Sequence, residues 1–155
     1  MHLVIGFPGF LFFIGGAQLE FSTEEHANSV ARAMVNAVLA MAGAGIFDII
    51  FDRLTGSGFR LTALVSAQLA GLVAVCAGAN VFEGWAAFLV GMIAAASQLM
   101  WAKLLVRLRV DDAVDAVSVH LGAGIWGIIA RPLLERQTGV MYIAVGARLP
   151  GLLLP

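Results

Sequence analysis

Long apolar stretches, separated by short polar connectors, dominate the chain. Five of them reach the roughly 17–25 mostly apolar residues that a helix needs to cross a bilayer. The pattern therefore predicts an all-α membrane protein: a single five-helix domain over residues 1–135 and an irregular C-terminal tail over 136–155. The five predicted transmembrane helices cover approximately 3–19, 30–51, 63–82, 85–106 and 114–134.

Composition agrees with a membrane location and excludes several classes of function. Of 155 residues, 61% are hydrophobic and 12% are charged, which is far more apolar than a soluble domain. The formal net charge of -1 provides no basic surface for nucleic acid. Three histidines and one cysteine, at no metal-ligand spacing, predict no metal site and no cofactor. No nucleophile is followed by a base and an orienting group, so an enzyme is not expected.

The positions of the basic residues predict an orientation. The start of the chain lacks the basic leading region of a signal peptide, so it is interpreted as a membrane segment. With five crossings, it shares one side of the membrane with most of the cations in the connectors. The positive-inside rule then places the N-terminus in the cytoplasm or the mitochondrial matrix, without distinguishing the plasma membrane from the mitochondrial inner membrane. These cations are Arg53, Arg60, Lys103, Arg107 and Arg109.

The stretch "SVHLGAGIWG" combines a histidine with three glycines. Gly122, Gly124 and Gly127 have the residue type and spacing of a dinucleotide-binding fingerprint, but that motif requires a preceding strand, which the sequence does not predict. On a helix, residues three and four apart share a face, so we expect the glycines to support close helix packing or an open path. His120 would then point toward protein or a cavity. Two roles stay open for it: a functional ionisable group, or a neutral histidine with a hydrogen-bond partner. The predicted face comprises Ala116, His120, Ala123, Gly124 and Gly127.

Other polar residues in the apolar segments are assigned structural roles. Asn36 is expected to form hydrogen bonds between helices. Asp48 and Asp52 lie near a predicted helix end, where capping and solvated charge are the expected roles. Three carboxylates precede the fifth segment and are predicted to cap it or to favour its positive end: Asp111, Asp112 and Asp115.

Taken together, several runs resemble the ammonium transporter and Rhesus-protein family. "LRVDDAVDAVSVHLGAGIWGIIA" is similar to the family's DDP-x-D segment followed by V-H-G-x-x-G-x-W-G. "SVARAMVNAVLA" resembles its A-x-x-x-V-N-T-x-x-A helix, with Asn36 at the asparagine. "LTALVSAQLAGLVAVCAGANVFEGWAAFLVGMIAA" is similar to the next two helices. The resemblance extends over roughly residues 3–134.

The resemblance implies about eleven membrane helices in full-length members, built as two five-helix inverted repeats around a pore. This chain corresponds to the second repeat, so it is expected to be half-length. His120 takes the place of the second of two pore histidines, and Ser22 is matched to the serine of the family's F-G-F-N-x-G-S run, a pore or substrate residue if the chain conducts. The chain departs from the family pattern where Ala113 replaces a proline and Leu121 a glycine, and where the first segment lacks the gate phenylalanine and asparagine.

Three hypotheses follow for function. In the first, the chain is a non-conducting accessory subunit that docks against other subunits of a larger membrane complex, with an energy-transducing complex as one option. In the second, it is one half of an ammonium or ammonia channel that conducts once a complementary half binds. In the third, it is a fragment of a longer transporter. All three predict the lipid bilayer and other membrane helices as partners.

Overall fold

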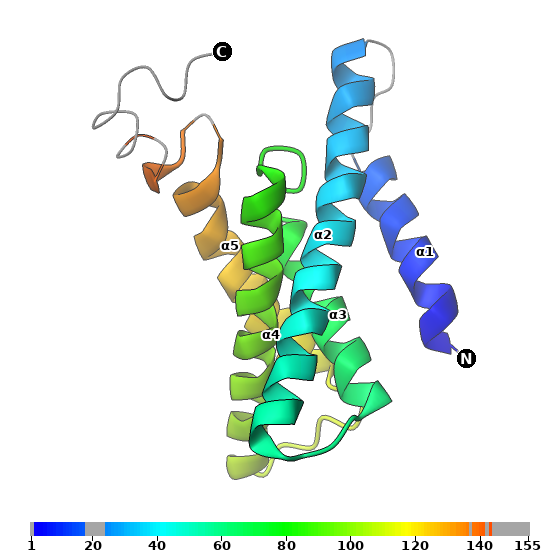
Figure 1. The fold of residues 1–155 in the computed structure, drawn as a ribbon, viewed down its shortest axis with the longest axis vertical. Helices are drawn as coiled ribbons and strands as arrows, with labels where there is room; N and C mark the ends of the chain where they lie inside the picture. The colour runs from blue at the N-terminus through cyan, green and yellow to red at the C-terminus, as the bar shows by residue number, and fades with distance from the viewer. Residues whose placement is uncertain (1, 18–23, 137, 142, 144–155) are drawn as a thin grey trace.

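The computed structural model describes residues 2–17, 24–136, 138–141 and 143 (Figure 1). Ser22 and most of the predicted tail lie outside the described residues. Within them the chain is mostly helical, and η1 is a single π-helical turn. The elements are α1 (His2–Gly16), α2 (Glu24–Thr55), α3 (Leu61–Val75), α4 (Gly84–Arg107), η1 (Ser118–Gly122) and α5 (Ala123–Leu134).

Helix lengths support the predicted fold class more firmly than the predicted number of crossings. Among the described residues, α2 and α4 are long and apolar enough to cross a membrane, judged by length and composition. The remaining apolar helical stretches have 10–17 residues: Phe7–Gly16, Leu61–Val75 and Ser118–Leu134. The prediction of a helical protein is confirmed, and five crossings stay a prediction.

Two predicted segments are shorter in the structure, whereas α2 extends beyond the predicted 30–51 at both ends. The segment expected over 63–82 is helical only to Val75, after which the chain turns. Gly78 permits this turn, since a Cβ there would lie 2.8 Å from the Phe82 ring. The segment expected from residue 114 becomes helical only after Asp115, whose φ of 57° lies in the left-handed region. An L-residue in that conformation cannot continue a right-handed helix.

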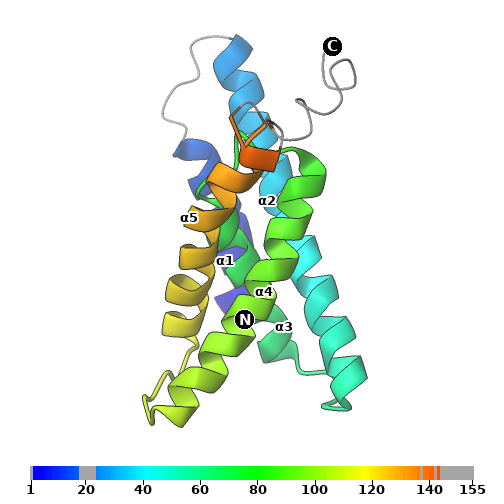
Figure 2. The ribbon, with the colours of Figure 1, turned by 90° about the vertical axis from the view of Figure 1, so that its left-hand side faces the viewer.

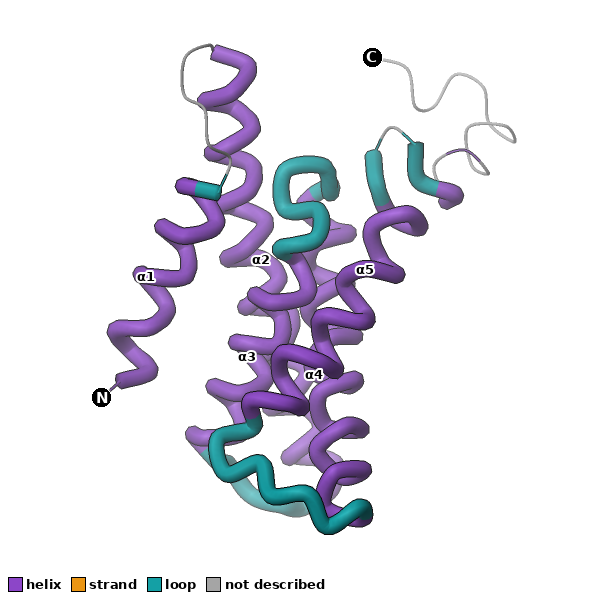
Figure 3. The backbone as a smooth tube through the Cα atoms, turned by 180° about the vertical axis from the view of Figure 1, so that it is seen from behind, coloured by secondary structure: helices purple, strands orange, loops and turns teal. Residues whose placement is uncertain are grey.

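The helices form one bundle, in which α2, α3, α4 and α5 run side by side while α1 lies against α2 (Figure 1). Seen from behind, α1 and α5 occupy opposite sides of the bundle (Figure 3). The connection from α2 to α3 and the connection from α4 to η1 lie at the same end (Figure 2). The C-terminal ends of α2 and α4 therefore lie at the end of the bundle opposite the α3–α4 turn, where the two helices diverge (Figure 2).

Small residues allow the helices to approach closely. The buried positions of α2, α3 and α4 are mainly alanine and glycine. A Cβ added at Gly91 in α4 would overlap the backbone of Ala40 in α2, and one at Gly127 in α5 would overlap the backbone of Ala74 in α3. Membrane helices associate through this kind of backbone approach, because lipid is as apolar as the side chains.

Asn36 joins α2 to the turn between α3 and α4. Its side-chain amide is 2% exposed and donates hydrogen bonds to the carbonyl oxygens of Ala79 and Phe82, both at 2.8 Å. The end of α5 reaches the same turn, since the Arg136 N–H donates to the Val81 carbonyl at 3.1 Å. Three elements therefore meet at this end of the bundle.

Close packing at Gly127 leads to a stability prediction. Gly127→Ala should destabilise the bundle by about 1–3 kcal/mol or more, because the added methyl group overlaps the Ala74 backbone. Gly124→Ala is the matched control: its Cβ would meet only Val73 Cγ1, at 4.0 Å. Both variants gain similar helix propensity, so that contribution cancels. Thermal unfolding of each purified variant in detergent, followed by circular dichroism, measures the difference, and equal Tm values would contradict the packing described here.

Candidate functional site

Two aspartates shape the entry to η1. The Asp112 carboxylate accepts hydrogen bonds from the backbone N–H groups of Val117 and Ser118, at 3.0 and 3.1 Å to Oδ2. The Asp115 carboxylate accepts from the Ser66 hydroxyl of α3 at 3.0 Å, and its left-handed backbone ends the loop. The third predicted capping residue, Asp111, is exposed. The start of the π-helix is thus held by one carboxylate of its own loop and one contact to α3.

Hydrogen bonding also changes the acidity of Asp112. Desolvation alone would raise the pKa of its carboxyl, but backbone N–H donors from Ser118, Val117 and Ala116 outweigh this effect and hold the pKa below its ordinary value. Asp112 therefore stays ionised at neutral pH. An ionised carboxylate at a helix start also interacts favourably with the positive end of the helix dipole.

His120 lies in the middle of η1, and its side chain is exposed. This differs from the predicted shared face, because Ala123 and Gly127 are buried. The i→i+5 bonding of a π-turn accommodates an extra residue, which shifts the register of the chain. His120 is therefore rotated away from the buried glycine side, and within this chain it lies on the outer surface of the bundle. Single π-turns often occur at functional sites.

The three glycines after His120 have different surroundings. A Cβ at Gly122 would lie 2.6 Å from Trp101 Cδ1 of α4, and one at Gly127 would overlap the α3 backbone. Gly124 is half-buried, with open space at its Cβ position. Two of these glycines thus hold η1 and α5 against the bundle, while Gly124 does not have the close approach that the sequence predicts.

Asp48 and Asp52 are buried, in contrast to the expected solvated charges. They are 2% and 4% exposed, and the Arg60 guanidinium donates a hydrogen bond to Asp52 Oδ1 at 3.1 Å. Within the described part of the chain, Asp48 Oδ1 has no hydrogen-bond partner. The reason for the difference is packing: the last turns of α2 lie against α3 and α4, so the carboxylates face the bundle.

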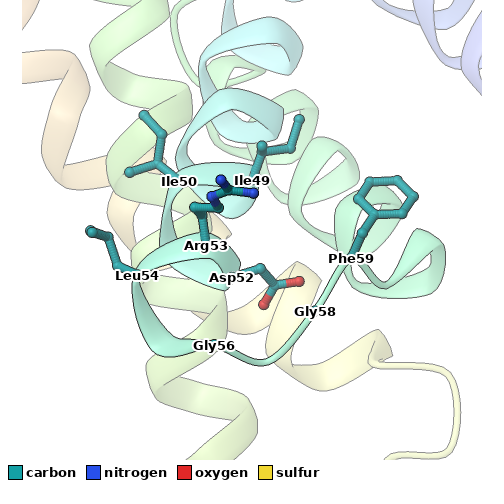
Figure 4. A pocket seen from close by; sticks show the side chains of 8 residues that line it. All are labelled: Ile49, Ile50, Asp52, Arg53, Leu54, Gly56, Gly58 and Phe59. Atoms are coloured by element: carbon teal, nitrogen blue, oxygen red, sulfur yellow. The ribbon is translucent and has the colours of Figure 1, made fainter.

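A pocket of about 630 Å³ lies beside this end of α2 (Figure 4). The Asp52 side chain points toward the segment containing Gly58, whereas the Arg53 guanidinium lies back along the helix near Ile49 and Ile50 (Figure 4). The lining is mainly apolar. Across the residues that the structure describes, no three His, Cys, Asp or Glu side chains come together as a metal site.

Three polar contacts near η1 were not assigned from the sequence. The Ser97 hydroxyl of α4 donates to the Gly122 carbonyl at 3.0 Å, and the Trp126 indole N–H donates to the Val90 carbonyl at 3.1 Å. The Ser66 contact to Asp115 is the third. The W-G motif singles out Trp126 as a residue to consider. Ser66 and Ser97 stand in apolar runs, and nothing in those runs indicates a hydrogen-bond partner.

Sequence comparisons identify relatives. The family model described as "Ammonium Transporter Family" matches residues 2–148. A candidate ammonium transporter of Caenorhabditis elegans is 36% identical over 139 residues, which is 90% of this chain and 26% of that protein. Ammonium transporter 1 member 1 of Arabidopsis thaliana is 32% identical over 110 residues, which is 71% of this chain and 22% of that protein. The chain spans about a quarter of these relatives, a smaller share than the predicted half.

Solved structures show the same fold. A protein titled "Sensor Amt Protein" superposes with a TM-score of 0.75 and 28% sequence identity, over 82% of this chain and 30% of that one. Mep2 of Saccharomyces cerevisiae superposes with a TM-score of 0.73 and 24% identity, over 86% of this chain and 30% of Mep2. The helical architecture and the family match over residues 2–148 indicate the same fold. The chain belongs to the Ammonium Transporter Family and is an integral membrane protein.

Proposed function

We propose that this bundle forms one wall of a membrane pathway, does not conduct ammonium by itself, and acts by docking against other membrane helices as an accessory subunit. The observation that supports this role is the exposed position of His120. Its neighbours on the outer surface are apolar, and together they make up the His120 face: Val117, His120, Leu121, Ile125 and Ile128.

A histidine on this face needs a polar partner once the bundle is in a membrane. Leaving a polar group unpaired in an apolar environment costs roughly 2–7 kcal/mol. The described residues leave His120 on the outside, so a second surface must cover it or water must reach it. Ionisable residues at membrane depth generally face a bundle interior or a water-filled cavity for this reason.

Inverted-repeat architecture suggests what such a second surface would be. Transporters of this kind place the substrate path at the interface between two repeats, so each repeat supplies one wall. The region matched by this chain makes up only 26% and 22% of the two relatives described above. A complementary bundle, from another chain or another part of a longer protein, is therefore the partner that would complete the path.

The same geometry supports a second candidate function, a channel half. His120 exposes its imidazole on a π-turn, and Gly124 leaves open space where another residue would place a side chain. Both features suit the lining of a path that carries ammonium or ammonia. This function requires the complementary bundle, whereas an accessory subunit would have its His120 face covered without an open path.

Charge placement favours one orientation. The C-terminal ends of α2 and α4 and the start of α3 lie at one end of the bundle, which carries Arg53, Arg60, Lys103 and Arg107 (Figure 1). We propose that this end faces the cytoplasm, or the matrix in a mitochondrion, with the chain crossing the membrane five times.

The first test is transport by the isolated chain. Purified protein in liposomes should show no methylammonium uptake above protein-free liposomes, because a single wall encloses no path. Circular dichroism of the reconstituted protein would show that it is folded. Uptake that rises with the amount of folded protein would disprove the non-conducting role.

The second test separates a channel half from an accessory subunit. If the chain conducts together with a complementary five-helix half, His120→Ala should change methylammonium flux by about 2–10-fold, as expected for the loss of one hydrogen-bonding group. Ile128→Ala is the control, since Ile128 lies on the same face, is 71% exposed and cannot ionise. Equal flux in the His120 variant and the unmodified pair would exclude a conducting role for the histidine.

A further inference from the structure

One carboxyl group of α2 is buried without a full set of hydrogen-bond partners. Asp48 is 2% exposed, and within the described part of the chain its Oδ1 atom accepts no hydrogen bond. An ionised carboxylate loses its hydration on burial, so it needs several donors or a cation beside it to offset that loss. Asp48 must therefore find a partner for its negative charge or exist without that charge.

The charged groups around Asp48 are unequal in number. Asp52 lies one turn further along α2, and Arg60 lies immediately before α3; among the described residues these are the two charged groups that act on Asp48. Arg60 is already engaged, because its guanidinium donates a hydrogen bond to Asp52 Oδ1 at 3.1 Å. With both aspartates ionised, two negative charges would face one positive charge, and like charges four residues apart on a helix repel each other.

The neighbouring helices bring different groups to this part of α2. From α3, the neutral amide of Gln68 reaches α2 at Gly45, where a Cβ would lie 3.1 Å from Gln68 Nε2. Gly45 precedes Asp48 by three residues, so the two share a face of the helix. From α4, Lys103 is exposed, and its Nζ lies over the Phe51 ring at 5.1 Å from the centroid. Its ammonium group is thus held at the surface by a cation–π contact.

Solvent reaches the ion pair more easily than it reaches Asp48. Asp52 lines the pocket beside α2, and its side chain points toward the segment containing Gly58 (Figure 4). Asp48 is not among the described residues that line this pocket. The Arg60 side chain is 52% exposed. Asp48 therefore occupies an enclosed position one turn from a carboxylate that adjoins the pocket.

An enclosed carboxyl group of this kind suits a proton better than a larger cation. A metal ion needs several oxygen ligands around it, whereas a proton needs a single carboxyl oxygen. Carboxyl groups within membrane segments often take part in proton binding and transfer. Protonation would also replace a second buried anion by an O–H donor.

We propose that Asp48 is a proton-binding site, which holds a proton at neutral pH while the ion pair between Asp52 and Arg60 is kept. The neutral acid leaves one negative and one positive charge in this cluster, so its net charge is zero. When the proton leaves, both carboxylates compete for the Arg60 guanidinium, which links the contact between α2 and α3 to pH. The assignment does not depend on whether the His120 face conducts ammonium.

Infrared spectroscopy of the full chain, in a detergent without ester groups, tests for the proton directly. A protonated carboxylic acid has a C=O stretching band that an ionised carboxylate lacks. We expect this band at neutral pH in the unmodified protein and its loss in Asp48→Asn, whose amide has the shape of the neutral acid. Asp111→Asn is the matched control and should keep the band, because Asp111 is exposed. Absence of the band from the unmodified protein, or its persistence in folded Asp48→Asn, would overturn the proposal.

A second variant tests the link to the ion pair, and it locates the proton even if Asp48→Asn does not fold. Asp52→Asn removes the neighbouring negative charge and frees the Arg60 guanidinium, so Asp48 should ionise more readily. We expect its proton affinity, measured by pH titration of the acid band, to fall at least about tenfold, which moves the midpoint by about one pH unit.

Glu83→Gln is the control for this titration. It frees the guanidinium of Arg136 from an ion pair at the opposite end of the bundle, where Glu83 Oε1 lies 2.7 Å from Arg136 Nε. The midpoint should not change in this variant, because the freed charge is far from Asp48. An unchanged midpoint in folded Asp52→Asn, or an equal shift in Glu83→Gln, would contradict the assignment of the proton to Asp48.

Discussion

Direct backbone contact between helices is the constraint on which the rest of this protein depends. In α4, Gly91 meets the backbone of Ala40 in α2, and in α5, Gly127 meets that of Ala74 in α3. Lipid offers apolar surroundings as favourable as other side chains, so association depends on dispersion contacts at short range. Any larger residue at these positions would separate the helices and move the π-helix that leads into α5.

Polar side chains add specificity to this packing, because each links two different elements. Asn36 connects α2 to the α3–α4 turn, Ser97 connects α4 to η1, and Ser66 connects α3 to the loop before η1. A buried polar group without a partner is costly, so these pairs favour one arrangement of the helices over others. Their combined effect is to hold η1 so that His120 faces outward.

The bundle has two chemically different surfaces, the His120 face and the basic end, and each suits a different environment. The His120 face is apolar apart from one imidazole, which suits a second helical bundle. The end of the bundle at which α2 and α4 finish carries Arg53, Lys103 and Arg107, which fits the proposed cytoplasmic or matrix side of the membrane. Both surfaces are properties of a family member whose matched region covers only 22% to 30% of the relatives described above.

The sequence by itself determined the helical class, the membrane location and the family, because apolar runs and the motif around His120 are readable residue by residue. Only the tertiary structure decided the direction of His120, the burial of Asp48 and Asp52, and the difference between Gly124 and Gly127. Regular α-helical spacing cannot anticipate a π-turn, which here follows a left-handed Asp115 and the Asp112 hydrogen bonds. The surroundings of a side chain depend on which helix packs against it, and that contact involves residues distant in the sequence.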